Sequence, residues 1–515
     1  MSPGTLSLDG ATLTPEAVAL IARSDAKVEL ALEARQRNDA ARRAVANLLA
    51  RGDALYGATT GVGALRAYRV PKKDRERYAL SLLRSHACGA GPPLAQELVR
   101  AAMATRANQI GAGGAGIAAE LLDALVGALN AGLAPFTREL GSLGTGDLTG
   151  LADIALALLG EGQVWRGQEL IGAATAFSEA GLAPGRLGPR DGLAFISSNA
   201  VTIGQAALLV VDARRLLNAW LSVAALSFEA AAADPVVVDA RIHSASHRPG
   251  QAAIAQRMRE LLSGLAERSR QVGPLGVQDP YPFRALPQVD GAVYDALAAL
   301  AETVGHELNF AGENALIIAG EDIALPNGNP HAAPLSNAID NLRTALAQSA
   351  ALIAARVSTM LDTSLTGLPP FLARRPGPES GALVLEYTAH SAAAEVRSLV
   401  TPVAAQTVSV SRGVESHASL APIAARRAAE TLQALRVVVA TELVVAVRAL
   451  RLAGHEPVGA GTRPLFDAAA ARLSPDLSDR PLHPDVEAAR VLIDGWGSDD
   501  PRHQPAFPTA GASPP

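Results

Sequence analysis

Long alanine-rich runs at helical spacing constrain the fold of this chain more than any other feature. They cover residues 200–233, 291–320, 334–361, 381–400 and 418–455. Runs of this length exceed the usual helix of a globular protein and are typical of long bundle helices. The alternation that marks a β-strand is nearly absent, and the best strand candidate is the short VVVD around Val236. We therefore predict an all-α fold built around a long-helix bundle.

The N-terminal part also shows helical spacing but contains more loops. TPEAVALIA opens with Thr14 and Pro15, a typical helix start, and the helical spacing continues until Gly52. Glycine and proline clusters then separate shorter segments. We predict a loop-rich active-site domain over 1–200, a long-helix bundle with C-terminal helices over 201–475, and an extension over 476–515. The extension is rich in Pro, Ser and charge from about residue 498, which favours disorder.

Composition excludes several classes of protein. The net charge of −5 and the pI of about 6.1 argue against a nucleic-acid partner. Cys88 is the only cysteine, so no internal disulfide forms and a reducing compartment is expected. The first thirty residues carry scattered charges unlike a signal peptide, and no uncharged apolar window of about 18 residues is found. We expect a cytoplasmic protein that binds a small molecule and no membrane.

The polar residues of interest lie in the glycine-rich loops, where binding sites usually lie on a rigid scaffold. Tyr56 stands in ALYGATTGVGAL, where a loop tyrosine suits acid–base chemistry. Arg284, in VQDPYPFRALPQV, offers a planar fork for a carboxylate. Neighbouring loops add the polar side chains of His86, Gln278, Tyr281, Glu415 and His417.

Two motifs suggest other functions but lack the context they need. GAGGAG at 111–116 matches G-x-G-x-x-G, yet the preceding VRAAMATRANQI looks helical, whereas a dinucleotide site requires a strand there. DARIHSASH places His243 and His247 four residues apart beside Asp239, a spacing that could bind a metal. No third ligand is evident, so a hydrogen-bonded loop is favoured over a metal site.

Seven segments carry a family resemblance when taken together and in order. They are YGATTGVG, SHACGAG, ELGSLGTGDLTGLADIALALLGEG, VDARIH, VQDPYPFRALPQV, GNPHAAP and GVESHASL. Between about residues 10 and 475 the chain resembles the histidine and aromatic amino acid ammonia-lyase family, the histidine type most closely. The resemblance implies the fumarase/aspartase-like all-α bundle, a homotetramer, and active sites built from loops of several subunits.

The resemblance also implies roles for individual residues. Tyr56 matches the family's acid–base tyrosine, Arg284 its carboxylate clamp, and Ser197 the position of an active-site asparagine. The implied catalytic set is Tyr56, Tyr281, Glu415, Gly144, Thr145 and Gly146. The implied substrate-binding set is Gly63, His86, Ser197, Gln278, Arg284 and Asn314. No metal is implied.

The family's electrophile, 4-methylidene-imidazol-5-one (MIO), forms from an Ala-Ser-Gly triad of the chain itself. The amide nitrogen of the glycine attacks the alanine carbonyl, and the serine then loses water. Here these positions hold Gly144, Thr145 and Gly146, and Pro330 replaces a phenylalanine of the site. A group derived from Thr145 would carry a methyl on its electrophilic carbon, and β-branching restricts the rotamers of its precursor.

These substitutions favour a carbon–nitrogen lyase that works without a normal MIO group and needs no added cofactor. Tyr56 would then act on an amino-acid-like substrate whose own carbonyl acidifies a C–H bond. Three alternatives stay open. They are a lyase or aminomutase with an MIO-like group grown from 144–146, an MIO-independent cyclase, and an inactive binding homologue.

Overall fold

The computed structural model describes residues 5–24, 26–265 and 278–496, which form two compact units. Among these described residues, unit 1 takes those up to 211, 301–339 and 402–425, and unit 2 takes those of 212–300, 340–401 and 426–496. The predicted disordered tail from about 498 lies outside the described residues. The predicted domain boundaries after residues 200 and 475 stay a prediction.

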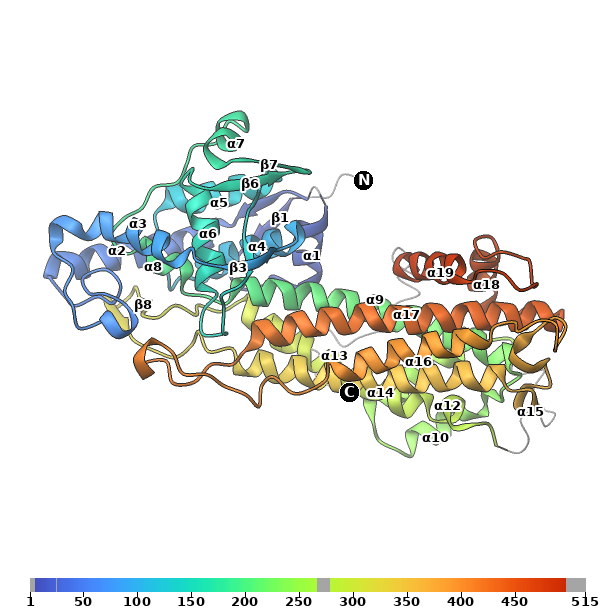
Figure 1. Cartoon of the computed structure of the whole chain (residues 1–515). Coiled ribbons are helices and arrows are strands. Elements are labelled where there is room, and N and C mark those ends of the chain that lie inside the picture. Colours follow the sequence, from blue (N-terminus) through green and yellow to red (C-terminus); the bar gives the residue numbers. More distant parts are fainter. Residues whose placement is uncertain (1–4, 25, 266–277, 497–515) are drawn as a thin grey trace. The chain divides into compact units, whose positions relative to one another are not determined.

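Helices dominate the described chain, as predicted (Figure 1). The helices of unit 1 are α1 Pro15–Arg23, α2 Leu32–Arg51, α3 Arg75–His86, α4 Gln96–Ala112, α5 Ala119–Asn130, α6 Leu148–Leu158, α7 Ala173–Glu179 and α8 Asp191–Ile196. Those of unit 2 are α10 Ala240–Ser244, α11 Pro249–Leu261, α12 Tyr281–Arg284, α15 Thr363–Thr366, α16 Leu383–Ser398, α18 Thr462–Ala470 and α19 His483–Gly495. Four helices contain residues of both units: α9 Ala200–Ala230, α13 Leu286–Leu308, α14 Ala333–Leu361 and α17 Ala421–Ala453.

The described strands are short and form small ribbons. They are β1 Leu6–Leu8, β2 Val28–Leu30, β3 Ala90–Pro93, β4 Ala134–Pro135, β5 Arg138–Leu140, β6 Gln163–Arg166, β7 Glu169–Gly172, β8 Leu316–Ile318 and β9 Ile323–Leu325. β1 pairs parallel to β2, and β3–β5, β4–β6–β7 and β8–β9 pair antiparallel. Short 3-10 turns complete the connections at η1 Gly63–Leu65, η2 Lys72–Asp74, η3 Pro235–Val238, η4 Pro370–Leu372 and η5 Ser411–Gly413.

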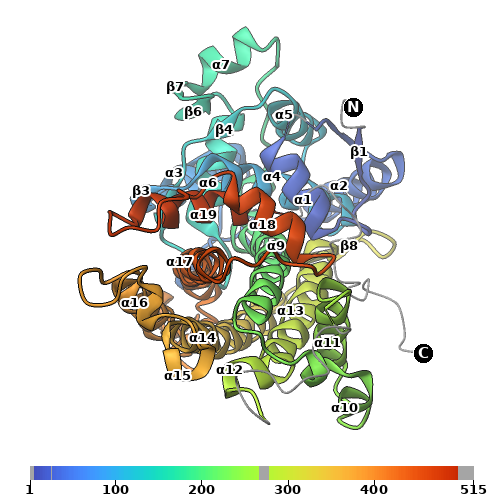
Figure 2. The same cartoon turned by 90° about the vertical axis from the view of Figure 1, so that its right-hand side faces the viewer.

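The long helices α9, α13, α14 and α17 run side by side, and Figure 2 views them nearly end-on. Two buried carboxylates of unit 2 link them. Asp290 on α13 accepts hydrogen bonds from Trp220 Nε1 on α9 (3.2 Å) and from Ser349 Oγ on α14 (2.6 Å). Glu442 on α17 pairs with Arg356 of α14 at 2.7 Å. Small alanine side chains between these links let the helices approach closely.

Glu442 also accepts a hydrogen bond from Ser227 Oγ of α9 at 2.9 Å. Its ion pair with Arg356 is fully buried, and a buried charge is tolerated only when it is paired and hydrogen-bonded. Burial raises the pKa of Asp290 to about 6, against the opposing effect of nearby Arg356. The bundle is therefore specified by polar contacts as well as by its apolar core.

Three expectations about secondary structure are wrong. The helical region ending at Gly52 is two helices, because Val28–Leu30 pairs with Leu6–Leu8 as a parallel ribbon. The helix expected over 291–320 ends at Leu308. The strand expected at Val236 is the 3-10 turn η3, because the side chain of Asp234 accepts the N–H of Val236 and Pro235 starts a helical turn.

Hydropathy alone identifies two stretches long and apolar enough to cross a membrane, Asp191–Ala230 and Ala333–Leu361. The expectation that no such stretch exists was therefore too strict. Their most apolar windows are 89% and 61% buried within the structure, as in core helices.

Candidate active site

The Gly144–Gly146 segment is fixed by a buried carboxylate directly before α6. Asp147 donates its backbone N–H to the carbonyl of Ser198 (2.7 Å). Its carboxylate accepts hydrogen bonds from Ser142 Oγ (2.5 Å) and from the backbone N–H of Thr202 (2.7 Å). Burial raises the pKa of Asp147, and these hydrogen bonds oppose that rise. The three residues before Asp147 are thus held on a rigid base.

The two glycines of this segment adopt conformations that other residues rarely take. Gly144 has φ +83° and Gly146 has φ +124°. The Gly144 carbonyl accepts hydrogen bonds from Ser419 Oγ (2.9 Å) and the N–H of Ala332 (3.2 Å). The N–H of Gly146 donates to Asn199 Oδ1 at 2.9 Å. Both peptide groups are therefore occupied by protein partners.

Thr145 presents its hydroxyl to Glu415, which lies 270 residues away in the sequence. Thr145 Oγ1 donates to Glu415 Oε2 at 3.2 Å, and both side chains are partly buried. Glu415 ends a hairpin that begins at Val410, closed by a 2.8 Å hydrogen bond from Val410 N–H to the Glu415 carbonyl. None of the ion pairs among the described residues includes Glu415. This carboxylate can therefore receive a cationic group of a substrate.

Tyr56 lies in the turn that follows α2, with its phenol oxygen fixed by the backbone. Tyr56 Oη accepts the N–H of Gly63 at 2.7 Å. A donor at this position also stabilises the oxygen after it has given up a proton. Tyr78 of α3 lies near it, and burial together with the neighbouring Tyr56 raises the pKa of Tyr78. The phenol oxygen of Tyr56 is thus held at a defined position in the loop.

Ser197 and Asn314, two further residues of the predicted set, are hydrogen-bonded to each other. The N–H of Asn314 donates to Ser197 Oγ at 3.0 Å, and Asn314 Oδ1 accepts the N–H of Asn327 at 3.2 Å. His86 ends α3, and its Nδ1 lies 2.8 Å from the carbonyl of Leu82 in the same helix. The side-chain hydrogen bonds of His86 stay within α3, and none reaches another predicted site residue of the described chain.

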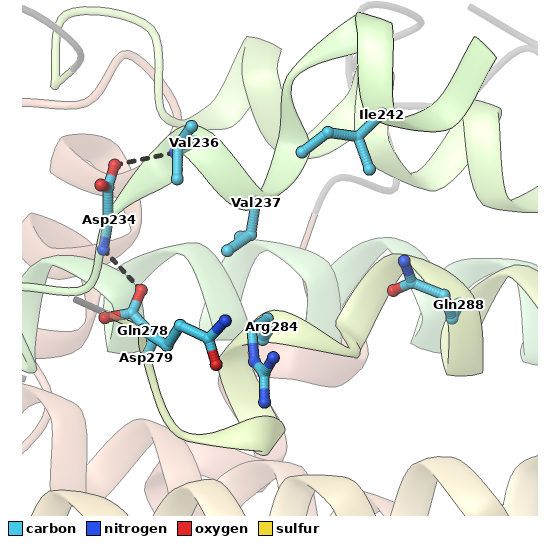
Figure 3. Close-up of a pocket in the computed structure, with 8 residues that line it drawn as sticks. All are labelled: Asp234, Val236, Val237, Ile242, Gln278, Asp279, Arg284 and Gln288. Atoms are coloured by element: carbon cyan, nitrogen blue, oxygen red, sulfur yellow. Dashed lines mark hydrogen bonds between the residues drawn. The ribbon is translucent and has the colours of Figure 1, made fainter. Parts of the chain in front are cut away.

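The remaining three predicted residues, Gln278, Tyr281 and Arg284, belong to unit 2. Gln278 and Arg284 line a pocket of about 250 Å³ (Figure 3). The guanidinium of Arg284 lies 4.8 Å from the ring centre of Tyr281, which is 66% exposed. The Nε of Arg284 is buried and has no hydrogen-bond partner among the described residues. The pocket is lined by Asp234, Val236, Val237, Ile242, Gln278, Asp279, Arg284 and Gln288.

Asp279 links two segments of the chain that line this pocket. Its carboxylate accepts the backbone N–H of Asp234 at 2.7 Å, the contact drawn in Figure 3. Burial raises the pKa of Asp279, and the positive charge of Arg284 opposes the rise. Gln278 and Arg284 therefore stand on a fixed backbone and offer polar groups that suit a substrate carboxylate.

Several residues of these networks escaped the sequence prediction. Ser419 and Asn199 hydrogen-bond directly to the backbone of Gly144 and Gly146 but were not among the predicted residues, although Ser419 lies inside GVESHASL. His331 and His417 form a further pair, with 2.9 Å between Nε2 and Nδ1. The sequence analysis named His417 as a residue of interest, whereas the only signal for His331 was its position inside GNPHAAP.

The two alternative motifs take structural roles. GAGGAG follows helix α4 instead of a strand, which argues against a dinucleotide site. His243 Nε2 lies 2.9 Å from the carbonyl of Val237, and its Nδ1 lies 3.0 Å from Gln251 Nε2. The described residues contain no group of three or more His, Cys, Asp or Glu side chains that could hold a metal ion.

The described part of the chain is an all-α scaffold that carries a backbone-bound tyrosine and an arginine with a buried Nε, and comparison with known proteins identifies the family. Residues 13–471 match the model of the aromatic amino acid lyases. Histidine ammonia-lyase of Symbiobacterium thermophilum is 36% identical over 94% of this chain and 96% of its own length. That of Geobacillus kaustophilus is 37% identical over 88% and 90%. The chain belongs to the aromatic amino acid lyase family and is a carbon–nitrogen lyase.

Solved structures agree with this assignment. Ergothionase of Treponema denticola, an ergothioneine-degrading enzyme in complex with desmethyl-ergothioneine sulfonic acid, superposes with a TM-score of 0.91 and 28% identity. The superposition covers 95% of this chain and 98% of that one. A tyrosine aminomutase from Streptomyces globisporus gives a TM-score of 0.90 and 29% identity, covering 95% and 97%. The all-α fold predicted from the sequence is confirmed.

The residues at 144–146 do not fit the family's electrophile. A Cβ on Gly144, as an alanine there requires, would lie 2.1 Å from Ser419 Oγ and 3.1 Å from the backbone nitrogen of Ala421. The positive φ of Gly144 adds strain for any side chain. Thr145 meanwhile uses its hydroxyl as a donor to Glu415, whereas ring formation would remove that hydroxyl.

Proposed function

We propose that this chain eliminates an amine from a small amino-acid-like substrate without an MIO group, with Tyr56 as the acid–base residue. The observation that carries the proposal is the pairing of Thr145 with Glu415 at 3.2 Å beside a Gly144 that has no room for a side chain. The hydroxyl of Thr145 thus has a role as a hydrogen-bond donor that its dehydration would abolish.

The proposed reaction moves one proton and breaks one bond. Tyr56, as the phenolate, takes a proton from the carbon next to the one that bears nitrogen. The electron pair forms the carbon–carbon double bond, the C–N bond breaks, and the amine leaves with the bonding pair. The N–H of Gly63 keeps Tyr56 Oη in place during the transfer. Tyr56 ends protonated and returns its proton to solvent.

Charged groups at both ends would orient the substrate. Glu415 lies beside Thr145 without an ion-pair partner and would bind the cationic nitrogen. Arg284 would bind the carboxylate, supported by Gln278 and Tyr281. We also propose that each site combines residues of several copies of the chain in a homotetramer. Cytoplasmic location is part of the same proposal, in line with the single cysteine.

A site without an electrophile needs a leaving group that departs unaided. Ergothioneine, the compound degraded by the structurally similar ergothionase, is a betaine whose nitrogen carries three methyl groups. Such a nitrogen has no lone pair with which to add to an electrophile, and it leaves as a neutral amine. We therefore include betaines of histidine-like acids among the proposed substrates, beside free amino acids with an activated C–H bond.

One observation favours the alternative of an MIO-like group derived from Thr145. The Gly144 carbonyl receives two donors, Ser419 Oγ and the N–H of Ala332, which would polarise it for attack by the Gly146 nitrogen. The same contacts also suit a purely structural role. The intact mass of the active protein separates the two interpretations.

The test combines mass spectrometry with a small substrate panel of histidine, tyrosine and ergothioneine. We expect an unmodified chain that turns over at least one of them. Thr145→Ala should lower kcat only severalfold, as expected for one hydrogen bond, whereas Tyr56→Phe should lower it by about a thousandfold or more. A mass lower by two water molecules, or a folded but inactive Thr145→Ala, would favour the Thr145-derived group. Tight binding without turnover would indicate an inactive binding homologue.

A further inference from the structure

The side chain of Ser411 joins the loop that carries Tyr56 to the hairpin that carries Glu415. Ser411 Oγ accepts the backbone N–H of Ala64 at 3.0 Å. The preceding N–H, that of Gly63, donates to Tyr56 Oη at 2.7 Å. Two consecutive amides thus hold the phenol oxygen on one side and the hairpin on the other, across 347 residues of sequence.

The backbone of Gly63 leaves space for the side chain of residue 411 at this contact. Gly63 has φ +54°, and a Cβ there would lie 2.6 Å from Ser411 Oγ. The absence of a side chain at position 63 therefore lets the serine reach Ala64. Gly63 is required both for its conformation and for this approach.

The hairpin tip is itself held in an unfavourable conformation. Ser411 and Arg412 have φ +53° and +57°, which costs a non-glycine residue about 1 kcal/mol or more. The N–H of Gly413 donates to the carbonyl of Val410 at 3.0 Å, and Val410 pairs with Glu415 at the base. The tip therefore presents the Ser411 hydroxyl at a fixed position relative to Glu415.

We propose that Ser411 is a positioning residue that keeps the Tyr56 oxygen and the Glu415 carboxylate in register. The inference rests on the proposed roles of these two groups. A loop without this contact moves, and a small displacement of a proton-transfer group lowers the rate steeply. Ser411 touches neither substrate nor reacting atoms and acts through the amides of Gly63 and Ala64.

Hydrogen exchange of the full-length protein tests the contact without any substrate. In Ser411→Ala, peptides over residues 57–66 should exchange about tenfold faster, because one hydrogen bond of their backbone is lost. Ser411→Asn should restore protection, since asparagine tolerates a positive φ and offers an amide oxygen as acceptor.

Thr407→Val is the matched control. Thr407 Oγ1 accepts the N–H of Ala418 at 2.9 Å, which is the same kind of bond in the same segment. Its loss should leave the exchange of residues 57–66 unchanged. Unchanged exchange in Ser411→Ala, or an equal rise throughout unit 1, would overturn the proposal.

Kinetics with a substrate from the panel then test the role in catalysis. Ser411→Ala should lower kcat about tenfold and change KM less than twofold, because the tyrosine is misplaced while the binding groups remain. In a Tyr56→Phe background the same change should cost nothing further. An unaltered kcat despite faster exchange contradicts the positioning role. If no substrate is turned over, the proposed function fails, and the exchange data still decide whether Ser411 holds the loop.

Discussion

The site residues of unit 1 and those of unit 2 differ in how completely they are hydrogen-bonded. In unit 1 the polar groups of Tyr56, Thr145 and Gly144 each have a partner within the same unit. In unit 2 the buried Nε of Arg284 has no partner among the described residues, and Tyr281 is mostly exposed. The proposed proton-transfer group is therefore already held by hydrogen bonds within unit 1, whereas the proposed carboxylate-binding arginine of unit 2 keeps, among the described residues, a free hydrogen-bond donor for a ligand.

Removing the phenol oxygen of Tyr56 should have the largest effect on activity. Tyr56→Phe should reduce kcat by about a thousandfold or more, the range expected for a general acid–base group. Steady-state kinetics with the best substrate of the panel measure the loss. Tyr68→Phe is the matched control, because Tyr68 is a 70% exposed tyrosine of the same loop. A similar loss in both variants would refute a specific role for Tyr56.

Removing the cation of unit 2 should affect binding more than chemistry. Arg284→Ala should raise KM by about 10- to 100-fold and alter kcat little, because a charge-assisted hydrogen bond contributes about 1.5–3 kcal/mol. The exposed Arg241, 89% accessible at its side chain, provides the control Arg241→Ala. A fall in kcat at unchanged KM would place Arg284 in the chemical step instead.

Co-expression of the two impaired variants tests whether Tyr56 and Arg284 of one site come from different copies of the chain. In mixed oligomers of Tyr56→Phe and Arg284→Ala chains, up to about a quarter of the sites should combine an intact tyrosine with an intact arginine, since each is drawn at random. Activity at low substrate concentration should therefore return in the mixture. Separately purified and unmixed variants serve as the control, and a mixture as inactive as its components contradicts shared sites.

Glu307, in unit 1, is a polar residue whose carboxylate lacks a hydrogen-bond partner among the described residues. Changing it should give the smallest effect of these predictions, and the effect concerns stability. Its carboxylate is largely buried and forms no hydrogen bond or ion pair with another described residue, and burial raises its pKa to about 7. The folded state therefore binds the proton of Glu307 more tightly than the unfolded state does. The stability that this proton binding contributes is fully present at low pH and is lost as the pH rises through the folded-state pKa of about 7.

Glu307→Gln should therefore raise Tm at pH 8 by a few degrees, because the buried charge costs at most about 3 kcal/mol of unfolding free energy. The gain in Tm should shrink towards pH 5. Thermal unfolding at several pH values measures it. The exposed Glu302 of the same helix supplies the control Glu302→Gln. A gain that does not depend on pH would show that burial does not perturb Glu307.

Local signals predicted those parts of the fold whose causes are local. Thr14 accepts the N–H of Ala17 and starts α1 at Pro15, as the sequence indicated. The long alanine-rich runs became α9, α14 and α17 almost to the residue. In contrast, the break after α1 depends on pairing between Leu6–Leu8 and Val28–Leu30, which helical spacing does not reveal.

The end of α13 at Leu308 likewise depends on distant partners. Asn309 accepts the backbone N–H of Leu13 and donates to its carbonyl, both at 2.8 Å, a contact across 296 residues. At the site, the resemblance supplied the residue types, and the structure joined Tyr56 with Gly63, Ser197 with Asn314, and Thr145 with Glu415. The roles of these residues stay a prediction. Ser411 and Asn199 lacked any sequence signal because their importance lies in hydrogen bonds to backbone groups far away in the chain.

The crowding around Gly144 has a consequence for engineering. Replacing Thr145 by serine would supply the missing primary alcohol. It would still leave Gly144 with a positive φ, and Ser419 Oγ occupies the space that a side chain at 144 would need. An alanine at 144 can enter only if position 419 is emptied as well. Installing a self-made cofactor in this scaffold is therefore a concerted redesign of three positions, and single-site libraries would miss it.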